Sequence, residues 1–137
     1  MLIETATAEL HAARRRDLRE RAERRRLQRL VGEIDQVIQT CEETHLQRIK
    51  QITPAIADMY ARSLGHAREL VADLGDAEAE RTVESIVHLQ PRRIVHVMDA
   101  MWGVQEVLFD LMQPSRQRLP EDIEDGRAQP GSWRPAA

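Results

Sequence analysis

Cysteine is almost absent from this sequence, since Cys41 is the only one among 137 residues. A single thiol cannot form an internal disulfide, and it cannot supply the several thiolates of a structural zinc site. Disulfide-stabilised extracellular domains and zinc-finger modules are therefore excluded as fold classes. The composition favours a reducing compartment, and we expect a cytoplasmic protein.

Long uncharged apolar segments are also missing. Glu4 follows Met1 within three residues, and no apolar segment comes directly after it. No charge-free stretch approaches the roughly 18 residues that a membrane-spanning helix needs. We therefore expect neither a secretion signal nor a membrane span, and no membrane partner.

The sequence lacks the common catalytic and phosphate-binding motifs. Its six glycines are scattered, so none of the glycine-rich loops that bind phosphate groups is present. The serine nucleophile elbow and the paired-histidine zinc motif are absent too. The sequence therefore predicts that the protein is not an enzyme and has no cofactor.

One partial metal motif is present on the first predicted helix. Glu42 and His45 have the spacing of half a di-iron site in a four-helix bundle, but the second half of such a site is missing. Cys41 has only His45 near it in sequence, and a cysteine on an apolar stripe is usually a small, unreactive core residue. We predict no metal and no catalytic residue, with His45 on the stripe that faces the bundle.

The first 52 residues predict one long helix. Between Thr5 and Ile52 there is no proline and one glycine, while Ala, Leu, Arg, Glu and Gln dominate. Apolar side chains recur there at alternating steps of four and three residues, which is the spacing of a stripe that faces partner helices. The stripe consists of Leu27, Val31, Ile34, Ile38, Cys41 and His45.

Capping residues divide the rest of the chain. Thr53 and Pro54 are typical of a helix start, Gly75 of a left-handed helix end and Asp76 of the next N-cap. Pro91 either begins a fourth helix or kinks a continuous one. We therefore predict an all-α fold, an antiparallel helical bundle over 1–112 with a long, Arg-rich projecting N-terminal helix. The predicted helices span about 3–52, 54–74, 76–90 and 91–112, and an extended or disordered tail spans 113–137.

The fourth predicted helix is apolar around most of its circumference, so we expect it to be covered on most sides. Its apolar surface exceeds what three neighbouring helices cover, which favours self-association or docking onto a larger subunit. A tryptophan in the tail has the character of an aromatic anchor. The predicted partner interface consists of Met101, Trp102, Phe109 and Trp133.

The net charge of −3 hides a basic segment, because residues 11–30 hold nine arginines against three acidic residues. Asp17 with Arg21 and Glu20 with Arg24 are spaced as helix-supporting pairs. On a helical wheel of about 100° per residue, seven arginines fall within roughly 160°, opposite the acidic residues and the apolar stripe. These arginines are predicted to face outward, and they are Arg14, Arg15, Arg19, Arg21, Arg25, Arg26 and Arg29.

A helix with one dense basic face can lie along a phosphate backbone and bind it independently of sequence. None of the four aromatic residues lies in the basic segment, so base stacking is not expected. The leading hypothesis is a non-enzymatic subunit of a larger nucleoprotein assembly, such as a ribonucleoprotein, with RNA and DNA both open. The alternative is a protein-interaction scaffold or oligomeric coiled coil whose basic face meets an acidic protein.

Overall fold

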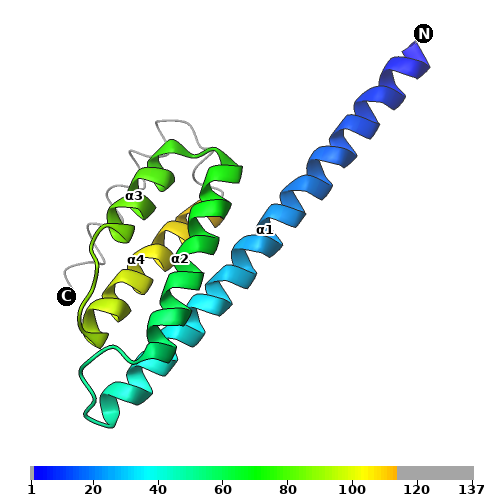
Figure 1. Cartoon of the computed structure of the whole chain (residues 1–137). Helices are drawn as coiled ribbons and strands as arrows, with labels where there is room; N and C mark the ends of the chain where they lie inside the picture. Colours follow the sequence, from blue (N-terminus) through cyan, green and yellow to red (C-terminus); the bar gives the residue numbers. More distant parts are fainter. Residues whose placement is uncertain (1, 114–137) are drawn as a thin grey trace, which may run out of the picture.

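Four helices make up the fold. The computed structural model describes residues 2–113, with side chains from Thr5 onward. The helices are α1 (Leu2–Leu46), α2 (Pro54–Leu74), α3 (Ala77–Val87) and α4 (Ile94–Met112), and no strand occurs among these residues. Successive helices run in opposite directions, and α1 packs against both α2 and α4 (Figure 1). The predicted all-α antiparallel bundle with a projecting N-terminal helix is confirmed.

Only the second half of α1 belongs to the bundle. The helix has 45 residues, which corresponds to a length of about 67 Å. Its first core residue is Leu27, and one step of four residues upstream the inward position is occupied by Glu23. The next inward positions are Glu20 and Arg16, so this side of the helix has no apolar surface to bury. Residues 5–26 therefore leave the bundle as a single helix, which we call the arm (Figure 1).

The stripe of α1 that enters the core is wider than the predicted one. Leu30 and Val37 are buried in addition to the predicted apolar residues, because α1 packs against both α2 and α4. Val31 is half-buried. The prediction that His45 faces the bundle is wrong: it is exposed, since it lies in the last turn, where the chain leaves the helix.

The first helix ends six residues before the predicted boundary. Arg48 adopts a left-handed conformation with φ 67°, and its N–H donates to the carbonyl of His45 at 2.8 Å. The following loop then pairs with the segment that precedes α4, where the Ile94 N–H donates to the Lys50 carbonyl at 3.0 Å. This pairing between distant segments gives a hydrogen-bond partner to the Lys50 carbonyl, which would have bonded within the helix if α1 were longer.

Caps at the second and third helices are confirmed. The Thr53 side chain accepts from the Ile56 N–H at 3.2 Å, Gly75 ends α2 with φ 69°, and the Asp76 side chain accepts from the Ala79 N–H at 3.0 Å. The predicted range 76–90 is too long, since α3 ends at Val87.

The fourth helix begins at Ile94, so Pro91 neither begins it nor kinks a continuous helix. Gln90 has φ 48°, which turns the chain before the proline, and Arg93 stands at the N-cap position without a capping side-chain hydrogen bond. The tail predicted over 113–137 lies, except for Gln113, outside the described residues. None of the described helices combines the length and the apolarity that a bilayer crossing requires.

Candidate nucleic-acid interface

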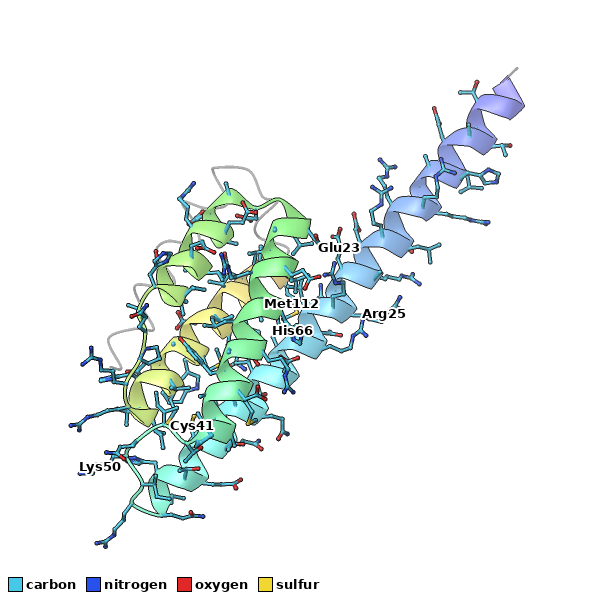
Figure 2. All side chains as sticks on the ribbon, in the orientation of Figure 1. Glu23, Arg25, Cys41, Lys50, His66 and Met112 are labelled. Carbon is cyan, nitrogen blue, oxygen red and sulfur yellow. The ribbon has the colours of Figure 1, made fainter. Side chains whose placement is uncertain are left out.

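The arm presents a row of exposed arginines to solvent. Arg14, Arg15, Arg19 and Arg25 are exposed, and none of them makes a hydrogen bond or ion pair with any described residue. Figure 2 shows Arg25 on the side of α1 that is turned away from the bundle. A guanidinium without an intramolecular partner keeps all five of its N–H donors available for an anion.

A fifth arginine of the arm has a weak partner. Arg21 Nη2 lies 3.0 Å from Asp17 Oδ2, one helical turn away, which confirms the predicted pair. Both side chains are exposed, and an exposed pair of this kind contributes only about 0.3–0.5 kcal/mol. Arg21 can therefore exchange this carboxylate for a phosphate at little cost.

The prediction that all seven arginines face outward is wrong for Arg26. Its Nη2 lies 3.0 Å from Asp73 Oδ2 on α2, so it holds the base of the arm against the bundle. Arg29 is exposed but lines a cavity of about 280 Å³ between α1 and α2, next to Glu33 and Glu69. The carboxylates of this cavity repel a phosphate. The free basic face therefore consists of five arginines of the arm, namely Arg14, Arg15, Arg19, Arg21 and Arg25.

The second predicted pair on the arm does not form. Arg24 Nη1 donates to the backbone carbonyl of Met112 at 3.4 Å, at the C-terminal end of α4, instead of pairing with Glu20. The last turn of a helix carries unpaired carbonyls and a partial negative charge, which favour a cation there. Arg24 therefore connects the base of the arm to α4 and does not add to the basic face.

A polar cluster links α1 to α2, and the sequence analysis had not indicated it. Ser63 is buried and its Oγ donates to Glu33 Oε2 at 2.8 Å. The Nδ1 of His66 lies 2.9 Å from the same oxygen, so the carboxylate stands between the hydroxyl and the imidazole. No direct Ser63–His66 hydrogen bond exists in this part of the chain, so the imidazole does not activate the serine as a nucleophile. The cluster fixes α1 against α2.

The single thiol lies in the core. Cys41 is fully buried, and burial together with the nearby Glu42 carboxylate raises the pKa of its thiol to about 11. A nucleophilic or metal-binding cysteine needs an accessible thiolate, which this environment disfavours. Glu42 and His45 are exposed, and no group of three or more metal-ligating side chains occurs within residues 5–113.

We expect Cys41 to be unreactive in the folded protein. Iodoacetamide reacts with the thiolate of an accessible cysteine, and here both exposure and ionisation are suppressed. Alkylation followed by mass spectrometry should be at least about tenfold slower in native buffer than in denaturant, because the thiol becomes accessible only through opening of the bundle. Equal rates in the two conditions would contradict the buried position of this side chain.

Most side chains of α4 are buried or half-buried, as predicted, but no described residue covers its outer side. Val95, Trp102 and Phe109 are 40%, 45% and 45% exposed. They are seven residues apart, so they form one row along the helix. Met101 does not belong to this row, because it is fully buried in the core of its own chain, and its prediction as a partner contact is wrong. Trp133 lies outside the described residues.

Comparison with family models, with characterised proteins and with solved structures finds no match to this chain.

Proposed function

We propose that this protein is a non-enzymatic helical subunit of a larger nucleoprotein assembly, in which the arm binds nucleic-acid backbone without sequence preference. One observation carries the proposal: four arginines without a partner and one weakly paired arginine lie exposed on one face of a helix that projects from its bundle. The lone buried cysteine agrees with the reducing cytoplasm that we propose as its location.

The geometry of the arm suits a phosphate backbone. Arg25 lies eleven positions after Arg14, which corresponds to about 16 Å along the helix axis. Double-stranded DNA carries one charge per about 1.7 Å of its axis, so several phosphates lie within reach of this row. Each neutralised phosphate releases condensed counterions, and binding therefore depends steeply on salt.

The arm offers no means of reading bases. It contains no aromatic residue on which a base could stack. Arginines on a freely exposed helix contact the backbone first, and backbone contacts position a protein without selecting a sequence. Affinity is therefore expected to follow charge and salt concentration.

The test is fluorescence anisotropy with labelled single- and double-stranded RNA and DNA at two salt concentrations. The variant Arg14→Glu, Arg19→Glu, Arg25→Glu should bind at least about tenfold more weakly at low salt, and its logarithmic salt slope on duplex DNA should fall by about 2–3, because about 0.9 is lost for each phosphate contact. The strand type that binds most tightly identifies the nucleic acid.

The matched control carries the same change of charge at other exposed arginines. This control is the triple variant Arg16→Glu, Arg81→Glu, Arg92→Glu. Arg16 lies on the arm but outside its basic face, Arg81 lies on α3, and Arg92 lies in the loop before α4. If this control loses as much affinity as the arm variant, the effect comes from net charge alone. That result, or the absence of any binding at low salt, would refute the proposal.

A further inference from the structure

The arm carries apolar side chains on the side that holds its arginines. Leu10 and Leu18 are 53% and 61% exposed, and no other described helix lies against this part of the arm (Figure 1). Together with three arginines they follow steps of four, four, three and four residues, which keep one row along a helix. We call this row the arm stripe, and it consists of Leu10, Arg14, Leu18, Arg21 and Arg25.

The uncovered side of α4 has the complementary chemistry. Between its three exposed apolar residues lie Asp99 and Glu106, which are exposed and have no partner among the described residues. Steps of four and three residues again give a single row. We call it the α4 stripe, and it consists of Val95, Asp99, Trp102, Glu106 and Phe109.

The two stripes match at four of their five positions when the helices run parallel. A constant difference of 85 residues places Leu10 opposite Val95, Arg14 opposite Asp99 and Arg21 opposite Glu106. In the same alignment, Leu18 lies within one residue of Trp102. At the first four positions of the row, apolar side chains thus meet apolar ones and arginines meet carboxylates, which is the pattern that specifies pairing in coiled coils. At the fifth position, Arg25 lies beside Phe109, and a guanidinium can stack on an aromatic ring.

A chain cannot satisfy this match by itself. Its own arm points away from the bundle, and its α1 runs antiparallel to its α4 (Figure 1). An arm parallel to α4 of a second copy is antiparallel to α1 of that copy, and antiparallel copies of one helix are what a two-fold axis generates. We propose that two copies form a closed dimer in which each arm packs along the α4 stripe of the other copy.

Physical reasons favour this arrangement over the alternatives. An isolated, mostly polar helix is marginally stable in water, and packing against a second helix stabilises it. A simpler dimer with two α4 stripes packed antiparallel about Trp102 would place Glu106 of one copy against Asp99 of the other, and like charges in such positions repel. The arm of a second copy supplies arginines at both positions.

The inference goes beyond the proposed function and does not depend on it. Arg15 and Arg19 lie off the arm stripe and stay accessible in the dimer, whereas Arg14, Arg21 and Arg25 are shared by the two surfaces. Dimer formation is therefore measured without nucleic acid and at one fixed salt concentration. A failure of the nucleic-acid experiment leaves the dimer test unaffected. The nucleic-acid experiment is in turn run at protein concentrations below the dissociation constant of the dimer, so that the shared arginines are free.

The experiment is sedimentation velocity of the full chain over an about hundredfold concentration range. We expect a concentration-dependent species at twice the chain mass of 15.8 kDa. Trp102→Glu should raise the dissociation constant at least about tenfold, because an aromatic residue at the centre of an interface contributes most to binding. Leu46→Glu, at a residue 81% exposed outside both stripes, is the matched control and should leave the dimer intact.

A charge exchange tests the register. Arg14→Glu and Asp99→Arg should each weaken the dimer, and the double variant should restore it to within about threefold, because the pair is then reversed. Circular dichroism of every variant verifies that the helices remain. A monomer at all concentrations, growth into open polymers, a dimer that tolerates Trp102→Glu, or a double variant without restoration would each overturn the proposal.

Discussion

Deletion of residues 1–22 should abolish nucleic-acid binding and leave the bundle folded. The shortened chain loses four of the five arginines of the free basic face and keeps Arg25. It begins upstream of Leu27, where the core starts, and it keeps Arg26 with its partner Asp73. With one phosphate contact left, the counterion-release contribution to affinity almost disappears.

The stability of the shortened chain is the internal control. Residues 5–22 make no described contact with the bundle of their own chain. At concentrations too low for dimers, we therefore expect the free energy of unfolding to change by no more than about 0.5 kcal/mol. Anisotropy on the strand type preferred by the full chain and urea unfolding by circular dichroism measure the two quantities on the same sample. Retained binding would place the nucleic-acid site on the bundle, and a collapse of stability would mean that the arm packs on it.

Leu108→Ala should destabilise the fold by about 2–5 kcal/mol, the range for leucine deletions in a close-packed core. Leu108 is fully buried on α4 and belongs to the cluster that α1, α2 and α3 share. Removing its side chain leaves a cavity among helices that are fixed by their other contacts, and only partial relaxation can fill it. Because domains of this size are stable by about 5–15 kcal/mol, this single change removes a large share of the total.

The matched control has the same chemistry at an exposed site. Leu46→Ala should change the free energy of unfolding by no more than about 0.5 kcal/mol, because the side chain is already largely in water. Urea titration of both variants gives the two values. A loss below about 1 kcal/mol at Leu108 would contradict its place in the core.

The local signals in the sequence predicted part of the fold correctly. The caps at Thr53 and Asp76 and the left-handed end at Gly75 depend on neighbouring residues alone, and each forms as expected. The segments that follow α1 and α3 instead turn at Arg48 and Gln90, and the loop after α1 pairs with the segment before α4. Such pairing joins residues that are distant in sequence, so periodicity could not predict either end.

The candidate site also has one part that the sequence predicts and one part that tertiary contacts determine. Helical period alone predicts that Arg14, Arg15, Arg19, Arg21 and Arg25 share one face, because no described residue of the other helices bonds to these five side chains. Where α2 packs against α1, the side chains of α2 determine the contacts of the α1 residues. Asp73 binds Arg26 and removes it from the basic face, and Ser63 and His66 both contact Glu33.

The sequence by itself therefore determined the helical class, the arm and its basic face, since these follow from composition and from a repeat that one helix imposes. The tertiary structure determined which of these side chains are exposed and can contact a partner. It buried Met101 and exposed Trp102 on the next position of the same helix, because α4 packs its inner side on the bundle and no described element covers its outer side. The apolar character of a side chain is a property of the residue itself. Whether that side chain is buried depends on which other residues pack against it, and the packing of the four helices determines this.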